Sequence, residues 1–409
     1  MEILRKHNVV QIKGRSTKDI SFLRPLLACL HQAIIDKGYQ DIELDFSRCD
    51  GIHPAGMLAV CMQAMKYRDQ GVSFALVSPI KDSLRRLFVN VGWSKLISPY
   101  EPESRFRGIS RVPATVFFTP EDQFSLVNRM MDALLESIKW RQRGDLAALE
   151  WAINEVTDNV LVHANSKVGG VAQLSVFPAS NKVQVDVCDA GVSIPYTFNL
   201  GFDKDPDALL MAVKEGVKGQ HSTGKGNGLF GSIQICEKSG GEFHIYSRHG
   251  HLMLVRRRGK ETGIRAINER VPFEGTLVSM KIDCSKPNIL SEALRLEGKV
   301  YSPDSFVDFK YDKASHIYFR VIEEAASWGS RAAGLPVRRK IRNLMEMNPG
   351  KVVLLDFSGI SIISSSFADE VLGKLFSEIG QEKFKKTVKI INANDLVGLL
   401  IEREIRQYN

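Results

Sequence analysis

The stretch EWAINEVTDNVLVHA, residues 150–164, decides how the middle of this chain is expected to fold. Its apolar residues recur at helical spacing and predict a helix with one buried stripe, made of Ile153, Val156, Val160 and Ala164. Glu155, Asn159 and His163 follow one another at i, i+4 and i+8 beside that stripe. A carboxylate, an amide and an imidazole in line predict either a solvated helix edge or a surface that contacts a ligand lying across the helix.

Three segments downstream carry residue types that suit nucleotide binding. Asp189 follows a predicted strand at 182–187 and begins the glycine turn that contains Gly191. The sequence GKGNGL, residues 224–229, leads directly into a predicted helix, and glycines at a helix start leave backbone N–H groups open to phosphate. Thr276 follows a glycine in the last predicted strand. Each segment is weak evidence alone, because Asp and Gly are common in ordinary turns.

Taken in order, E-x3-N on a helix, D-x-G after a strand, G-x-G-x-G-L at a helix start and G-T on a closing strand resemble the Bergerat-fold (GHKL) ATPases. The resemblance covers about residues 145–282, and the wording NEVTDNVLVHA is most similar to the anti-sigma-factor serine kinases. It implies a central α/β sandwich, with a mixed sheet covered by helices, that binds ATP and Mg²⁺. It also implies that residues 196–223 form a lid over the nucleotide.

The resemblance implies a role for each matching residue. Glu155 would be the general base, and Asn159 would be the ligand of Mg²⁺ within the nucleotide site. Asp189 would accept a hydrogen bond from the adenine amino group, with Gly191 leaving room for the ring. The remaining residues implied to contact ATP are His163, Gly224, Lys225, Gly226, Asn227, Gly228, Leu229 and Thr276. Ser193 departs from the family pattern, which often has a second glycine at this place.

The two ends of the chain repeat one sequence plan. DFSRCDGIHPAGMLAV (45–60) aligns with DFSGISIISSSFADEV (356–371), and in both an apolar strand precedes and a helix and a further strand follow. Both copies resemble STAS domains, the fold of anti-sigma-factor antagonists, and the C-terminal copy is most similar to a STAS-like domain of unassigned function. The family's phosphoacceptor serine has no counterpart at Pro54 and Ala55, whereas Ser365 and Ser366 occupy its place. These two serines are predicted to be phosphoacceptors, helix caps or both.

The expected fold class is therefore a multidomain α/β protein, with the Bergerat sandwich between two STAS-like α/β domains. The expected order is a STAS-like domain at 1–100, a linker at 101–120, the ATP-binding domain at 121–285, a linker at 286–300 and a STAS-like domain at 301–409. The first linker is rich in proline and contains a short predicted strand at 115–118. Within the ATP-binding domain, two strands are predicted to meet at a turn at 248–250.

Composition and charge narrow the class of protein. The chain has 409 residues, 44% of them hydrophobic and 25% charged, which is typical of globular domains. No apolar run approaches the ~18 residues of a membrane span, and the N-terminus does not resemble a signal peptide, so we expect a cytoplasmic protein without a membrane partner. The net charge of +8 accompanies no nucleic-acid-binding motif, which favours a solvated basic surface. Six scattered cysteines predict neither a disulfide framework nor a zinc site.

Three functions remain open from the sequence. The first is a serine/threonine protein kinase of the partner-switching type, with its STAS-like domains in cis. The second is an ATPase switch in which Glu155 activates water, and the third is a module that binds ATP without turnover. Ser365 and Ser366 favour the first function, and a base at Glu155 argues against the third. Expected partners are a regulatory protein of the STAS or sigma-factor-like type and a second copy of the chain.

Overall fold

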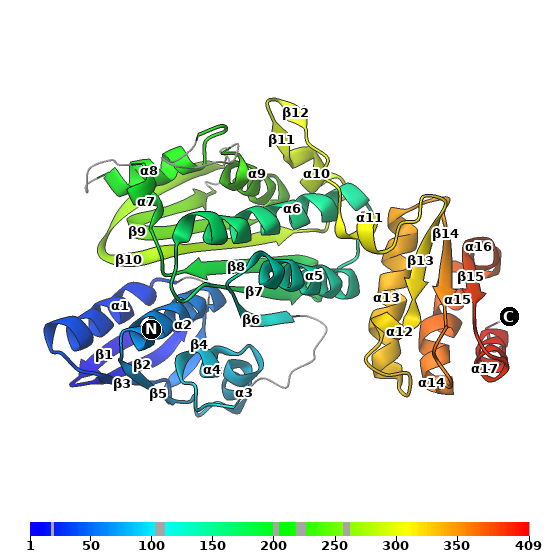
Figure 1. The fold of residues 1–409 in the computed structure, drawn as a ribbon, viewed down its shortest axis with the longest axis horizontal. Coiled ribbons are helices and arrows are strands. Elements are labelled where there is room, and N and C mark those ends of the chain that lie inside the picture. The colour runs from blue at the N-terminus through cyan, green and yellow to red at the C-terminus, as the bar shows by residue number, and fades with distance from the viewer. Residues whose placement is uncertain (18–19, 103–110, 199–203, 218–225, 257–261, 409) are drawn as a thin grey trace.

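The computed structural model describes residues 1–409 except 18–19, 103–110, 199–203, 218–225, 257–261 and 409. Its elements form three α/β units, each built on one main sheet (Figure 1). The terminal units have mostly parallel sheets, and the central unit has an antiparallel sheet. Among the helices of the described ranges, none is long and apolar enough to cross a membrane. The layout confirms the predicted multidomain α/β class.

The N-terminal unit alternates strands with helices. Its strands are β1 (Glu2–Lys6), β2 (Val9–Ser16), β3 (Asp41–Asp45), β4 (Cys49–Ile52) and β5 (Ser73–Val77). Its helices are α1 (Leu23–His31), extended by a π-helical turn at Gln32–Asp36, α2 (Pro54–Asp69), α3 (Asp82–Asn90) and α4 (Trp93–Ile97). β2, β3 and β5 are parallel neighbours, with β1 antiparallel at one edge and β4 parallel to β2. Because parallel neighbours need a crossover, helices separate the three strands.

The C-terminal unit repeats this plan. Its strands are β13 (His316–Arg320), β14 (Val352–Asp356) and β15 (Val388–Ile391). Its helices are α11 (Phe306–Lys310), α12 (Val321–Glu324), α13 (Arg331–Met347), α14 (Ser365–Ala368), α15 (Lys374–Ile379), α16 (Gln381–Thr387) and α17 (Asp395–Arg406), and a π-helical turn at Asp369–Gly373 joins α14 to α15. The parallel order β13-β14-β15, with helices between successive strands, matches the order β2-β3-β5.

The DFS motif makes the same local contact in both terminal units. The carboxylate of Asp45 accepts a hydrogen bond from the N–H of Ser47 at 2.8 Å, and that of Asp356 accepts one from the N–H of Ser358 at 2.8 Å. Each aspartate ends the middle strand of a parallel triplet and closes the turn after it. The sequence repeat therefore corresponds to a repeated piece of structure.

The central unit has the strand order β6-β7-β8-β10-β9. Its strands are β6 (Arg111–Phe117), β7 (Gly170–Phe177), β8 (Lys182–Asp189), β9 (Glu242–Val255) and β10 (Gly263–Asp283). Its helices are α5 (Pro120–Ser137), α6 (Arg143–Asn159) with a π-helical turn at Val160–Ala164, α7 (Ile194–Thr197), α8 (Asp205–Ala212), α9 (Gly228–Ser239) and α10 (Ile289–Ala293), followed by the hairpin of β11 (Arg295–Leu296) and β12 (Lys299–Val300).

Every pairing in the central sheet is antiparallel, which corrects the prediction of a mixed sheet. β7 and β8 are joined by a short turn at Pro178–Ser180, and such a connection allows only antiparallel neighbours. The turn predicted at 248–250 is also absent, because β9 runs through these residues. Arg248 has a φ of 52°, and the register against β10 shifts nearby, so the break in the sequence pattern marks a bulge rather than a chain reversal.

Parts of both expected linkers belong to the central unit. Residues 111–117 form β6, which pairs with β7 at the edge of the sheet. Residues 289–293 form α10, whose first turn is capped by Asp145 of α6. The Asp145 carboxylate accepts hydrogen bonds from the N–H groups of Leu290 and Ser291, both at 3.0 Å. A capping carboxylate on a different helix fixes α10 against α6.

Helix α2 lies between two sheets. Its residues from Ala55 to Met65 are all buried, so this part of the helix has no exposed face. It contacts β5 of its own sheet and β7, β8 and β10 of the central sheet (Figure 1). Val171, Cys188 and Leu277 of the central sheet share one hydrophobic core with it. A helix that is apolar all round is typical of such an interior position. Helices α5, α6 and α9 cover the opposite face of the central sheet.

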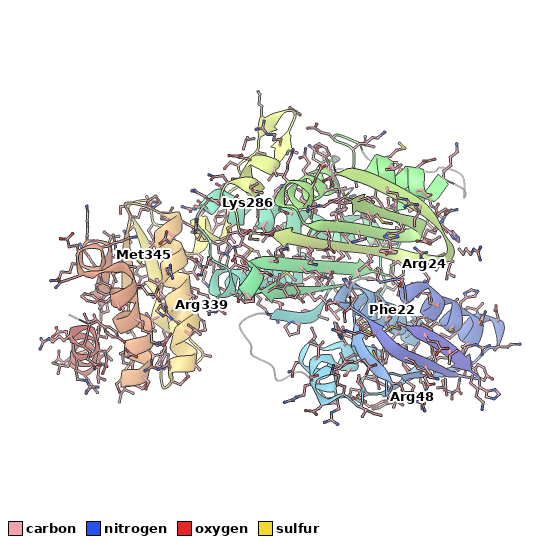
Figure 2. The ribbon with its side chains drawn as sticks, turned by 180° about the vertical axis from the view of Figure 1, so that it is seen from behind. Phe22, Arg24, Arg48, Lys286, Arg339 and Met345 are labelled. Carbon is pink, nitrogen blue, oxygen red and sulfur yellow. The ribbon has the colours of Figure 1, made fainter. Side chains whose placement is uncertain are left out.

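Polar contacts also hold the N-terminal unit on the central sheet. Arg24 of α1 lies at the junction of the N-terminal unit with the central sheet (Figure 2). It forms an ion pair with Glu269 of β10, and its Nη2 lies 3.4 Å from Nδ1 of His251 on β9. The His251 ring stacks on Tyr246 with 3.8 Å between centroids. Burial, assisted by His244 and Arg24, lowers the pKa of His251 to about 3, so the ring is neutral at pH 7.

Buried charges join the C-terminal unit to α5. Lys340 of α13 is 3% exposed, and its Nζ lies 2.9 Å from Asp132, 3.0 Å from Glu136 and 2.7 Å from Glu324. Burial opposes the charge of Lys340, but the three carboxylates outweigh it and raise its pKa above the ordinary value. The ammonium group therefore stays charged, and the contact fixes α13 on α5.

Candidate functional site

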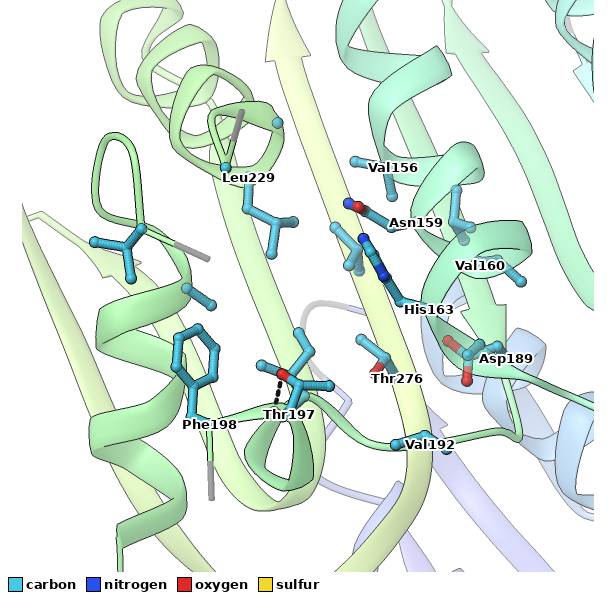
Figure 3. A pocket seen from close by; sticks show the side chains of 18 residues that line it. Val156, Asn159, Val160, His163, Asp189, Val192, Thr197, Phe198, Leu229 and Thr276 are labelled. Atoms are coloured by element: carbon cyan, nitrogen blue, oxygen red, sulfur yellow. Dashed lines mark hydrogen bonds between the residues drawn. The ribbon is translucent and has the colours of Figure 1, made fainter. Parts of the chain in front are cut away.

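A cavity opens between the C-terminal end of α6 and the start of α9 (Figure 3). Its floor is formed by β8 and β10, and α7 and α8 contribute the wall opposite α6. Counted together with the open solvent at its mouth, the cavity has an empty volume of about 900 Å³.

Most of the residues predicted for the nucleotide site come together around this cavity. The predicted residues that line it are Asn159, His163, Asp189, Gly226, Gly228, Leu229 and Thr276. Figure 3 shows Asn159 and His163 projecting from the end of α6 toward Leu229, with Thr276 and Asp189 at one end of the cavity. Residues far apart in the sequence thus converge on one space.

Other predicted residues have different positions. Glu155, Gly191 and Asn227 lie beside the cavity without lining it, and Asn227 accepts a hydrogen bond from the N–H of Gly216 at 2.9 Å. Gly224 and Lys225 lie outside the described residues.

Asp189 is the buried charge of the site. It is 4% exposed, and its carboxylate accepts hydrogen bonds from the N–H of Gly191, at 2.9 Å, and from the backbone of Thr276. Burial raises the pKa of Asp189 to about 7, although these hydrogen bonds work in the opposite direction. A carboxyl group with a strongly perturbed pKa in a cavity wall is typical of a binding or catalytic site.

Gly191 lets the turn after β8 approach the end of the α6 helix. A Cβ at Gly191 would lie 1.9 Å from the carbonyl oxygen of Ala164, which any larger residue would have to displace. The same oxygen accepts a hydrogen bond from the N–H of Val192 at 2.5 Å. Ser193, the departure from the family pattern, accepts from the N–H of Gly275 at 3.0 Å and donates to its carbonyl at 3.1 Å. The serine thus ties this turn to β10.

Glu155 lies against the start of α9. A Cβ at Gly228 would lie 2.4 Å from Oε2 of Glu155, so the carboxylate reaches the first residue of that helix. Burial, with a smaller contribution from Asp158, raises the pKa of Glu155. Gly226 has a φ of 73°, a conformation that favours glycine. The glycines therefore permit a close approach of backbone and carboxylate at this edge of the cavity.

Asn159 ends α6 where the helix widens into a π-helical turn. Such turns often occur at functional sites. Among the residues that the structure describes, none forms a hydrogen bond with the Asn159 side chain, which leaves its amide oxygen open toward the cavity. No group of three or more His, Cys, Asp or Glu that could hold a metal occurs in the described ranges.

The sequence did not single out the apolar walls of the cavity. The additional lining residues are Val156, Val160, Ala164, Val187, Val192, Ile194, Thr197, Phe198, Ala212, Val217 and Val278. Val156 and Val160 belong to the predicted helical stripe, and Val187 to the predicted alternating strand, so periodicity was the available signal.

The described part of the expected lid, residues 196–223, contains the end of α7 and the whole of α8. α8 is fixed to β9 because the Asp205 carboxylate accepts hydrogen bonds from Nε of Arg248 at 2.8 Å and from the N–H of His249 at 2.9 Å. Asp205 is 1% exposed, so this ion pair is buried. Residues 199–203 and 218–225 lie outside the described residues.

The two candidate phosphoacceptors lie on α14 of the C-terminal unit. Ser365 and Ser366 are exposed, and the helix cap is Ser364, whose hydroxyl accepts from the N–H of Phe367 at 3.0 Å. The alternative that Ser365 or Ser366 caps this helix is therefore wrong. The corresponding Ala55 of the N-terminal unit is fully buried.

The comparisons with known proteins concern the C-terminal unit. Among curated proteins, none matches the chain. Residues 333–397 match the family model described as a STAS-like domain of unknown function (DUF4325). The matched range runs from α13 to the start of α17 and includes β14, α14 and β15. The C-terminal unit therefore contains a STAS-like domain.

Proposed function

We propose that the central unit is a Bergerat-fold domain that binds ATP with Mg²⁺, and that the chain is a serine/threonine protein kinase of the partner-switching type. The observation that carries this proposal is the convergence of Asn159, Asp189, Thr276 and the glycine start of α9 on one cavity. These are the segments whose order in the sequence resembles the GHKL ATPases. The N-terminal unit, with its repeated strand order and DFS contact, is proposed to be a second STAS-like domain.

The cavity suits a nucleotide in shape and polarity. Val160, Val187 and Val278 offer apolar surface for a flat ring, and Asp189 offers an acceptor for a ring amino group. The first turn of α9, a helix of 12 residues, has free N–H groups and a partial positive charge that favour phosphate.

The residues present also suit Mg²⁺ and phosphoryl transfer. Mg²⁺ keeps several waters and takes few protein ligands, so the Asn159 amide oxygen together with phosphate oxygens would hold it. Glu155, one helical turn before Asn159, would orient or deprotonate the attacking hydroxyl. Its raised pKa brings the carboxyl group closer to the range in which a general base works at neutral pH.

The arrangement of the units indicates whether Ser365 and Ser366 receive phosphate within one molecule or from a second one. Ser365 and Ser366 lie in the C-terminal unit, whereas α7 and α8, which form one wall of the cavity, lie on the far side of the central unit (Figure 1). The contacts of Lys340 fix the C-terminal unit on α5. Phosphorylation of either serine is therefore proposed to occur between two molecules. The second candidate function is an ATPase switch in which Glu155 activates water. The core that α2 shares with the central sheet and the contacts of Lys340 with α5 would transmit a change in the central unit to both terminal units.

The fate of γ-labelled ATP tests the proposal. The full chain is incubated with Mg²⁺ and the labelled nucleotide, alone and with a Glu155→Gln chain that either keeps Ser365 and Ser366 or carries Ser365→Ala/Ser366→Ala. Label on protein supports the kinase, and release of phosphate without label on protein supports the ATPase switch. If the chain binds ATP but yields neither labelled protein nor free phosphate, both catalytic proposals are refuted and the central unit is a binding module.

A further inference from the structure

Ser247, Thr276 and Asp189 lie side by side on three neighbouring strands at one end of the cavity. In the register of the central sheet, Ser247 of β9 pairs with Thr276 of β10, and Thr276 pairs with Asp189 of β8. Thr276 and Asp189 line the cavity, whereas Ser247 is fully buried beside α7.

The contacts of Ser247 determine the direction of each hydrogen bond. Its Oγ lies 2.9 Å from the carbonyl oxygen of Gly275, 2.9 Å from the backbone nitrogen of Ile194 and 3.0 Å from Oγ1 of Thr276. A carbonyl oxygen can only accept and a backbone N–H can only donate. The single proton of Ser247 must therefore go to Gly275, because two oxygens at 2.9 Å without a proton between them would repel each other.

It follows that Thr276 donates its proton to Ser247. Ser247 then accepts two hydrogen bonds, from Ile194 and from Thr276, and donates one, so that the buried hydroxyl is fully satisfied. With its proton donated to Ser247, the Oγ1 of Thr276 can only accept hydrogen bonds from a ligand in the cavity. Since Asp189 next to it also accepts when ionised, this end of the cavity presents acceptors and calls for a ligand group that donates.

We infer that Ser247 is a positioning residue that holds the Thr276 hydroxyl as an acceptor and thereby makes the site prefer a base with an amino group over one with a keto oxygen. The inference rests on the proposed function, since it concerns the nucleotide bound in the same cavity. Ser247 acts only through Thr276 and does not itself reach the ligand. Without Ser247, the Thr276 hydroxyl is free to rotate and donate to a keto oxygen.

The test compares the affinities of the full chain for ATP and for inosine triphosphate, in which a keto oxygen replaces the amino group. Titrations at pH 8.5 keep Asp189 ionised, since its pKa is about 7. Ser247→Ala is expected to lower the preference for ATP about tenfold, the effect of one hydrogen bond of reversed direction. Ser193→Ala is the matched control, because Ser193 is equally buried and contacts the same Gly275 but not Thr276. It is expected to leave the ratio unchanged.

A double-mutant cycle separates positioning from a structural effect. In a Thr276→Val background, Ser247→Ala is expected to have no further effect on the ratio. An unchanged ratio in Ser247→Ala alone, or an equal drop in the Thr276→Val background, overturns the inference. If Ser247→Ala does not fold, Ser247→Cys replaces it, since a thiol is a weaker acceptor of similar size. A wild-type chain that binds neither nucleotide refutes the proposed function itself, which is a distinct outcome.

Discussion

Replacement of Asp189 by asparagine should have opposite effects on stability and on ATP affinity. Asparagine has nearly the same shape and keeps an oxygen that can accept from the N–H of Gly191. It carries no charge, so it removes the burial penalty of an ionised carboxyl group. It also replaces one of the two acceptor oxygens by an amino group, which cannot accept from the adenine amino group.

The magnitude of the stability change follows from the pKa of Asp189. A pKa of about 7 in the folded protein, against a reference value of 3.8, corresponds to about 4 kcal/mol, since one pKa unit is worth about 1.4 kcal/mol. Because the folded state binds the proton more tightly, this contribution to stability is fully present below pH ~4 and is lost as the pH rises through ~7. The asparagine variant lacks this loss and should be more stable than the wild type above pH ~7.

Two assays test the prediction. Urea unfolding should show that the stability advantage of Asp189→Asn widens by about 2–3 kcal/mol between pH 5 and pH 8.5. Calorimetric titration at pH 8.5 should show ATP affinity weakened by about 1.5–3 kcal/mol. A variant that is no more stable than the wild type at pH 8.5 would refute the buried state of the carboxylate. Unchanged affinity in the folded variant would refute the role of Asp189 in binding the base.

Three further changes test other parts of the site and its frame. Glu155→Gln should abolish phosphate transfer and release while ATP affinity stays within about threefold, because a base acts in the transition state; full turnover would place the base elsewhere. Gly228→Ala should lower turnover at least about tenfold, since the new Cβ would meet Oε2 of Glu155 at 2.4 Å, and rates equal to the wild type would contradict that contact. Lys340→Met should cost about 3 kcal/mol in urea unfolding because the buried Glu324 and the half-buried Asp132 and Glu136 lose a partner, and a cost below about 1 kcal/mol would show that the contact is not electrostatic.

Local patterns in the sequence predicted many elements of the fold. The alternation of strands and helices, the repeated DFS plan and the helix that carries Glu155 and Asn159 all appear in the structure. These features depend on residues close together in the chain, where hydrophobic periodicity and turn chemistry are informative. Local patterns did not predict the edge strands of the central sheet. The pairing of β6 with β7 and the lengths of β9 and β10 depend on partner strands that are far away in the sequence.

The same distinction applies to the site. Asn159, Asp189 and Thr276 carry recognisable side chains at recognisable spacings, and the structure places them around one cavity. Ser193 and Ser247 both donate a hydrogen bond to the carbonyl of Gly275. No local sequence pattern predicts this arrangement, because it depends on the register of three strands. The apolar run in α2 also gave no hint of its second partner, since burial against one sheet or two leaves similar residues in the sequence.

Calorimetric titration of the full wild-type chain with ATP is the most direct test of nucleotide binding by the central unit. With Mg²⁺ present, we expect saturable binding of one ATP per chain, and weaker binding when a chelator removes Mg²⁺, because Asn159 is proposed to act through the metal. A folded chain that shows no saturable heat at ~1 mM ATP with Mg²⁺ would refute the proposal that the central unit binds ATP.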